Sequence, residues 1–244
     1  AVYSFVSNFM IAIRPQIIKN HASGNFQAMH IQIIKSGKFG FFIMLLILLP
    51  LCGNIDYVLG LWLVDVPAHT ANFVVLVLLY SLLDGILTPI AIGVFAQGEI
   101  KAYEIALCII YAVNFIASYV CLKLGMAPET VFVLNIAFKA CVLADLLVHS
   151  KAKYAFPVHA FLKQCLLPSA VVFVLSGAFT YFMPWETPNS FWEFLLHTLA
   201  IIICTSLMAL AIGMTKGERL FLKKNLRDKI TVKLYLSLIH ISEP

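Results

Sequence analysis

Residues 71–96 read ANFVVLVLLYSLLDGILTPIAIGVFA, and Asp84 is the one acidic or basic side chain in this stretch. A helix of this length spans about 39 Å, which exceeds the roughly 30 Å hydrocarbon core of a bilayer. A membrane strand would be only about ten residues long and would alternate apolar with polar residues, which this stretch does not do. A helix also satisfies every backbone amide within the segment, as hydrocarbon requires. The stretch therefore predicts a transmembrane helix.

The rest of the chain has the same apolar character. Of its 244 residues, 61% are hydrophobic and 12% are charged, whereas soluble domains have about 45–50% apolar and about a quarter charged residues. A soluble globule of this length cannot bury so much apolar surface, and a disordered chain requires low hydrophobicity. We therefore expect an all-α integral membrane protein with seven transmembrane helices, at residues 1–13, 39–63, 71–96, 102–122, 130–148, 160–183 and 191–214.

The basic residues lie on one side of this predicted bundle. All Lys and Arg residues except Lys123 and Lys139 fall in or beside the connections after the first, third and fifth spans, or follow the seventh. Cytoplasmic loops of membrane proteins carry an excess of Lys and Arg. The pattern therefore places these connections and the C-terminus in the cytoplasm. A missed or additional span would destroy the alternation.

Three segments are not predicted to span the membrane. Residues 14–38 alternate Ile with Lys, His and Gln, which indicates a kinked amphipathic segment on the cytoplasmic interface. Residues 215–234 form a basic amphipathic tail, which either binds anionic lipid or merely fixes the topology as a solvated flank. Residues 235–244, YLSLIHISEP, resemble a translated sequencing adapter, and we assign them no function. The chain also begins inside an apolar run, as a fragment would.

Polar side chains inside the predicted spans are candidates for function, because a charged one costs about 2.5–3.5 kcal/mol at a helix centre. Lys139 and Asn135 are four residues apart and share one helix face. Lys139 is a candidate cation for a phosphate-bearing substrate in a cavity that Asn135 and Asn114 also line; alternatively, it reaches water or pairs with Asp84. Asp84 is a candidate proton- or sodium-coupling carboxylate, or else part of a structural ion pair or helix cap. Asp145 lies about 240° around the helix from Lys139 and is expected to face elsewhere.

Motifs of soluble enzymes are absent from the sequence. It contains no GxGxxG, P-loop, HExxH or GxSxG pattern, so we expect neither catalytic residues nor a cofactor. The six cysteines lie inside apolar runs without CxxC spacing, and we interpret them as small core residues rather than metal ligands or disulfides. Membrane topology accounts for the basic residues, so no nucleic-acid partner is expected.

Four short stretches together resemble a known family. They are RPQIIK at residues 14–19, SGKF at 36–39, LWLVDVP at 61–67 and QGEIKAYE at 97–104. As a set they are similar to the second half of bacterial polysaccharide-biosynthesis membrane proteins, the Wzx-like oligosaccharide flippases of the MOP superfamily. That superfamily also contains the MATE drug exporters. The resemblance covers roughly residues 1–230, and each stretch alone is weakly diagnostic.

The resemblance implies one lobe of a two-lobed transporter of twelve to fourteen helices in the bacterial inner membrane. Such a protein moves undecaprenyl-pyrophosphate-linked oligosaccharides by alternating access, with cavity cations near the pyrophosphate; Arg14 would lie at the cytoplasmic mouth. Its partners would be the lipid-linked oligosaccharide, bilayer lipids and the missing N-terminal lobe. The nearest alternative is a cation-coupled MATE-type exporter that uses Asp84. A membrane-embedded polymerase or acyltransferase is a further alternative, which the short outer loops disfavour.

Overall fold

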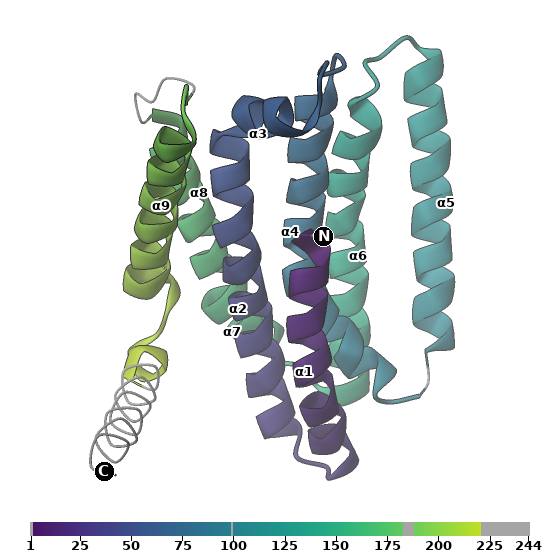
Figure 1. Ribbon diagram of the computed structural model, residues 1–244. Helices are drawn as coiled ribbons and strands as arrows, with labels where there is room; N and C mark the ends of the chain where they lie inside the picture. Colours follow the sequence, from purple (N-terminus) through teal and green to yellow (C-terminus); the bar gives the residue numbers. More distant parts are fainter. Residues whose placement is uncertain (1, 99, 183–187, 221–244) are drawn as a thin grey trace, which may run out of the picture.

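The structure is a computed structural model that describes residues 2–98, 100–182 and 188–220, with side chains from Ser7 onward (Figure 1). All secondary structure in these residues is helical. The elements are α1 Val2–Ala22, α2 Phe26–Gly53, α3 Ile55–Trp62, α4 Thr70–Phe95, α5 Lys101–Lys123, α6 Thr130–Tyr154, α7 Val158–Phe161, the π-helix η1 Leu162–Leu166, α8 Leu167–Phe182, α9 Phe191–Met208 and the π-helix η2 Ala209–Gly213.

Six of the described helical segments are long and apolar enough to cross a bilayer, so the chain is a multi-pass membrane protein. They are α2, α4, α5, α6, the continuous stretch Val158–Phe182 and the stretch Phe191–Gly213. The prediction of an all-α membrane protein is confirmed, but a seventh span is not. The first predicted span, residues 1–13, is part of α1. This helix is not among the six, because polar residues such as Arg14 and Asn20 lower its hydropathy.

Successive helices run up and down, so the connections gather at two ends (Figure 1). The α1–α2, α4–α5 and α6–α7 connections lie at one end, and Lys19, Lys101, Lys151 and Lys153 lie in or beside them. We refer to this end as the cationic end. The α2–α3 and α5–α6 connections lie at the opposite end. This is the alternation that the basic residues predict.

Residues 14–38 do not form a separate interfacial segment, so that interpretation is wrong. α1 continues to Ala22, and only three residues separate it from the start of α2 at Phe26. Gly24 adopts the left-handed backbone conformation of the turn, at φ 69°, and the Asn25 side chain caps α2 by accepting from the Ala28 amide. Three isoleucines of the pattern, Ile17, Ile33 and Ile34, are buried against protein in the hairpin, whereas Ile18 and Ile31 are exposed.

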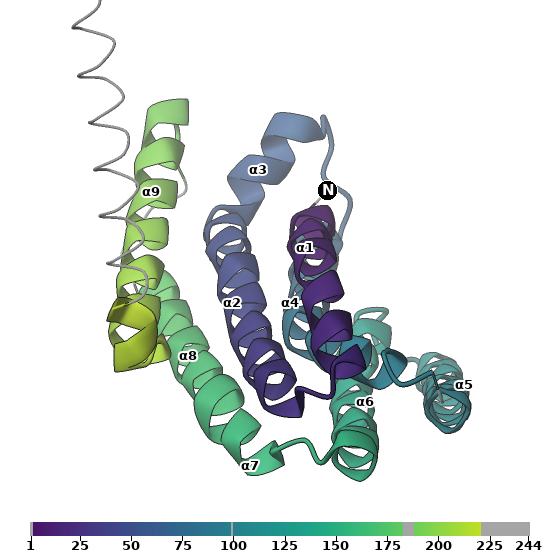
Figure 2. The same ribbon diagram turned by 90° about the horizontal axis from the view of Figure 1, so that it is seen from below.

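The second predicted span, residues 39–63, is also interrupted. α2 ends at Gly53, and after Asn54 the chain turns so that α3 lies across the end of the bundle (Figures 1 and 2). The Asn54 side chain donates from Nδ2 to the carbonyl oxygen of Pro50, 3.0 Å away. Such a bond satisfies backbone acceptors at a helix end, where no further amide follows.

α2 is the centre of the fold and packs most extensively against α4. Figure 2 shows α1 on one side of this pair, α8 and α9 on the other, and α5 outermost beyond α6. Gly40 and Gly85 allow the two backbones to touch, since a Cβ on Gly85 would lie 2.9 Å from the carbonyl carbon of Gly40. α5 packs against α6 and scarcely contacts α4.

The sixth predicted span, residues 160–183, contains a change of helix type before Pro168. In η1 the Leu167 amide donates to the Leu162 carbonyl, five residues back, which is the spacing of a π-helix. Proline has no amide hydrogen, so the wider turn lies where an α-helical bond is lost in any case. The seventh predicted span, residues 191–214, ends in η2, where Gly213 packs against the ring of Phe42.

All six cysteines are free thiols. Cys165 in η1 is fully buried, so the interpretation as a small core residue is confirmed in full for this one. Cys108 of α5 and Cys141 of α6 are exposed on the outside of the bundle, and the other three are half-buried. Apolar runs identify a membrane helix but do not distinguish the face that packs against protein from the face that meets lipid.

Candidate functional site

Asp84 of α4 and Lys139 of α6 form an ion pair inside the membrane-spanning part of the fold. Lys139 lies about 14 Å along α6 from its start, so the pair is near the middle of the bilayer. The Lys139 side chain is 8% exposed and the Asp84 side chain 18%. A charge in hydrocarbon requires such a partner, because burial of an unpaired ion is far more costly. Of the three arrangements that the sequence left open for Lys139, the structure has the pair with Asp84.

Two tyrosines surround this ion pair. The ring of Tyr80, one helical turn from Asp84 on α4, lies 4.1 Å from the Lys139 ammonium nitrogen, within the range of a cation–π interaction. Tyr111 of α5 lies within hydrogen-bonding reach of Tyr80. The sequence analysis did not identify either tyrosine, because an aromatic residue in an apolar run is usually a packing residue. Their spacing of four from Asp84 and three from Asn114 was the available signal.

The two predicted asparagines join this cluster from α5 and α6. Asn114 Nδ2 donates to Asn135 Oδ1 over 2.5 Å, and Asn135 lies one turn from Lys139 as the spacing predicts. The Oδ1 atom of Asn114 is buried without a hydrogen-bond partner in the described structure. We refer to Tyr80, Asp84, Tyr111, Asn114, Asn135 and Lys139 as the polar cluster. It lies on three helices, at the seam where α4 and α5 fail to pack together.

Arg14 is not part of the polar cluster. It is exposed on α1 and lines a recess of about 340 Å³ between α1, α4 and α5, together with Ser7, Thr88 and Tyr103. Thr88 lies one turn from Asp84 along α4, toward the cationic end. The predicted site residues therefore fall into two groups: Arg14 at this recess, and the others in the polar cluster. Asp145 Oδ1 lies 3.1 Å from His149 Nδ1. Asp145 does not face Lys139, which agrees with the prediction.

A second buried ion pair was not predicted. Lys38 of α2 donates from Nζ to Glu218 Oε2 over 2.6 Å, and both side chains are buried. The sequence analysis treated Lys38 as one of the cytoplasmic basic residues, whereas it is 1% exposed. The spacing Thr215-x-x-Glu218 is a capping-box signature that could have indicated a helix start here.

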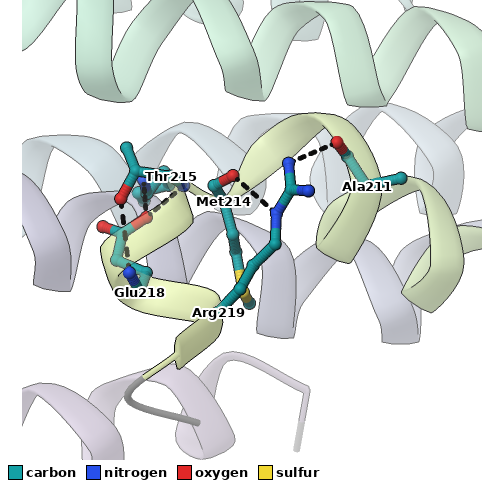
Figure 3. A network of polar contacts seen from close by, with 6 residues as sticks. Ala211, Met214, Thr215, Glu218 and Arg219 are labelled. Carbon is teal, nitrogen blue, oxygen red and sulfur yellow. Dashed lines mark hydrogen bonds and ion pairs between the residues drawn. The ribbon is translucent and has the colours of Figure 1, made fainter. Parts of the chain in front are cut away.

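The polar contacts around Glu218 hold the chain after η2 in place (Figure 3). The Thr215 amide donates to Glu218 Oε2 over 2.8 Å, and Arg219 donates to the carbonyl oxygens of Ala211 and Met214. Burial disfavours the charged carboxylate of Glu218, but the hydrogen bonds from Lys38 and Thr215 outweigh it, so its pKa lies below the usual value. Of the predicted basic tail, the structure describes residues 215–220, where Glu218 is buried and its neighbours are exposed; residues 221–234 and 235–244 lie outside the described residues.

A third group of polar side chains lies at the end of the bundle opposite the cationic end. Glu129, at the start of α6, accepts from Asn72 over 3.1 Å and lies 2.5 Å from His69 Nδ1. The hydrogen bond from Asn72, with those from its own backbone and His69, lowers the pKa of Glu129 to about 2. His69 has a left-handed backbone conformation, with φ 69°, which directs the chain into α4. The α3–α4 and α5–α6 connections are joined by this group.

The comparisons with known proteins identify no relative. No protein-family model matches the sequence, and neither the search of curated proteins nor that of solved structures found a match. Within the described residues, no three His, Cys, Asp or Glu side chains lie together as a metal site would require. The function is therefore inferred from the geometry of the polar cluster and from the sequence resemblance.

Proposed function

We propose that the chain is one lobe of a flippase that moves undecaprenyl-pyrophosphate-linked oligosaccharide units across the bacterial inner membrane by alternating access. The observation that carries this proposal is the Lys139–Asp84 pair, a buried charge pair that joins two membrane-spanning helices, α4 and α6. Charged residues in transmembrane helices mark substrate and ion pathways. The four sequence stretches supply the family expectation that gives this pathway a substrate.

Arg14 and Lys139 are placed to act in succession on an anionic headgroup. Arg14 is exposed near the cationic end and can bind phosphate oxygens through two parallel hydrogen bonds. Lys139 lies deeper and offers a compact point charge. Because its ammonium is already paired, an entering pyrophosphate would compete with Asp84 for it. Entry of substrate and release of Asp84 would then be a single exchange of partners.

The same pair gives less support to a cation-coupled exporter of the MATE type. Asp84 is bound to Lys139, so a coupling proton or sodium ion would first have to displace an ammonium group. A membrane-embedded polymerase or acyltransferase stays an alternative that no described contact favours. The orientation with the cationic end in the cytoplasm is part of the proposal and rests on the positive-inside rule.

The proposal is tested in the whole transporter, of which this chain would be one lobe, in cells that lack their own flippase. Lys139→Gln and Arg14→Gln are expected to reduce surface polysaccharide at least tenfold at equal protein level. Lys123→Gln, an exposed lysine at the opposite end of α5, is the matched control and should have no effect. Wild-type levels of polysaccharide with Lys139→Gln would refute the role of the pair.

A structural role of the pair is separated by a double variant. Asp84→Asn with Lys139→Gln removes both charges, so neither buried ion is left without a partner. We expect this variant to fold like the wild type and still to fail in transport. Restored transport would show that the pair only stabilises the fold.

A further inference from the structure

A second recess lies at the cationic end, between the α4–α5 connection, the start of α5 and the last turn of α6 (Figure 1). Its volume is about 530 Å³, within the range of roughly 300–1,000 Å³ typical of small-molecule sites. Lys101, the first residue of α5, and Lys153, near the end of α6, both line it. The other lining residues among those described are Gly98, Ile100, Ala102 and Ile105. We refer to this cavity as the basic recess.

The basic recess lies on the outer surface of the bundle. Ala102 and Ile105 are exposed, whereas Tyr103, between them in the sequence, is buried. Tyr103 lines the other recess, the one that contains Arg14, so the two recesses lie on different faces of α5. α5 is the outermost helix on this flank (Figure 2). A molecule from the surrounding lipid can therefore reach the basic recess without passing the polar cluster.

The lining of the basic recess changes from charged to apolar with depth. Lys101 and Lys153 lie at the ends of their helices, where the bilayer interface is expected. Ile105 lies one turn, about 6 Å, further along α5. A phospholipid has the same order, with its phosphate at the interface and its acyl chains below. Basic pockets between membrane helices bind anionic lipid headgroups.

The charges around the basic recess favour an anion. Two exposed lysines line it, and none of the described lining residues is Asp or Glu. Glu104 belongs to the first turn of α5 but does not line the recess, and Glu99 lies outside the described residues. A free phosphate ion would contact only the lysines, whereas a lipid also covers the apolar part of the lining. The lining therefore matches an amphiphile with an anionic head.

We propose that the basic recess binds an anionic phospholipid of the surrounding bilayer. Its phosphodiester lies between Lys101 and Lys153, and an acyl chain lies along Ala102 and Ile105. α5 packs mainly against α6, so a headgroup bound to both lysines joins the two helices at the cationic end. This lipid is a resident of the bilayer and not transported cargo, so the proposal does not rest on the proposed function.

The test is native mass spectrometry of the full chain in detergent, titrated separately with dioleoyl phosphatidylglycerol and dioleoyl phosphatidylcholine. The two lipids have the same acyl chains, but only phosphatidylglycerol has a net negative charge. We expect the wild type to bind phosphatidylglycerol about thirtyfold more tightly, because each lysine contributes about fivefold. Lys101→Gln or Lys153→Gln alone should lose about fivefold, and the double variant should abolish the preference. Lys101→Arg with Lys153→Arg should retain it.

Lys151→Gln with Lys163→Gln is the matched control. This pair removes two exposed lysines from the same end of the bundle, and neither of them lines the basic recess. It should bind phosphatidylglycerol like the wild type. Equal thermal unfolding midpoints of the two double glutamine variants show that both are folded.

Three results would overturn the proposal. Equal affinity of the wild type for the two lipids would show that the headgroup charge is not recognised. Equal losses in the two double glutamine variants would show a general attraction without a site. Release of the lipid by inorganic phosphate in millimolar excess would show that the recess recognises a free ion.

Failure of the proposed function looks different. Wild-type transport by Lys139→Gln would refute the flippase mechanism, and the preference for phosphatidylglycerol would be unchanged.

Discussion

Lys38 of α2 and Glu218, 180 residues further along the chain, are joined by an ion pair of 2.6 Å in which the two side chains are only 1% and 8% exposed. The pair attaches the segment after the last membrane helix to the most buried helix of the fold. Removal of one partner from a buried pair leaves an uncompensated charge, which costs about 3–5 kcal/mol, whereas removal of both is often neutral.

Glu218→Leu or Lys38→Met alone is therefore expected to lower the free energy of unfolding by about 3–5 kcal/mol, and the double variant by much less. The measurement is a double-mutant cycle by denaturant unfolding in detergent. Lys216→Met, at an exposed lysine two residues away, is the control. Additive effects of the two single variants would contradict the pairing.

Glu129 predicts a dependence of stability on acid pH. Its pKa is lowered from 4.5 to about 2 in the folded protein, so its hydrogen bonds contribute fully above about pH 5. That contribution is lost as the pH falls from 4.5 toward 2. The unfolding midpoints of wild type and Glu129→Gln should differ by a constant amount above pH 5 and should converge near pH 2. A gap for Glu129→Gln that persists at pH 2 would disprove the assignment.

Gly85 and Gly177 predict opposite effects of the same substitution. Gly85→Ala places a methyl group 2.9 Å from the backbone of Gly40 and Phe41, which must shift, at a cost of about 1–3 kcal/mol. Gly177→Ala meets no neighbouring atom and is expected to be neutral or to stabilise by up to about 1 kcal/mol, since alanine favours the helix. Thermal unfolding of both variants provides the comparison. Equal midpoints would show that α2 and α4 are not in backbone contact.

Cysteine labelling tests the orientation in the membrane. Ser23→Cys lies in the α1–α2 turn and Met126→Cys in the α5–α6 connection, both exposed and at opposite ends of the bundle. In a background without the six native cysteines, an impermeant maleimide should label Met126→Cys in intact spheroplasts. It should label Ser23→Cys only after permeabilisation. Labelling of both positions from one side would refute the alternating topology.

The sequence predicted the membrane character, most helices and the grouping of basic connections, because each depends on composition over many residues. Lys139, Asn135 and their shared helix face were also predicted, since a spacing of four fixes that relation. The spacing of residues along the sequence did not determine the ion-pair partners. The choice of Asp84 for Lys139, and of Glu218 for Lys38, depends on which helices are neighbours.

The errors in residues 14–38 have a physical reason. An amphipathic pattern around glycine is the same whether the apolar face meets lipid or a second helix. Here Ile17 and Ile33 are buried in a helical hairpin, and the chain continues without an interfacial segment. The end of α2 at Asn54 was also not predicted, because α3 is as apolar as the helix before it.

The close approach of Gly40 and Gly85 has a consequence for motion. Where backbone is in contact with backbone at this crossing, no flexible side chain lies between α2 and α4 to absorb sliding or rotation. If the chain acts as the proposed transporter, we expect these two helices to remain a fixed axis. The displacements of that cycle would then be made by α5 and α6 on one flank, or by α8 and α9 on the other.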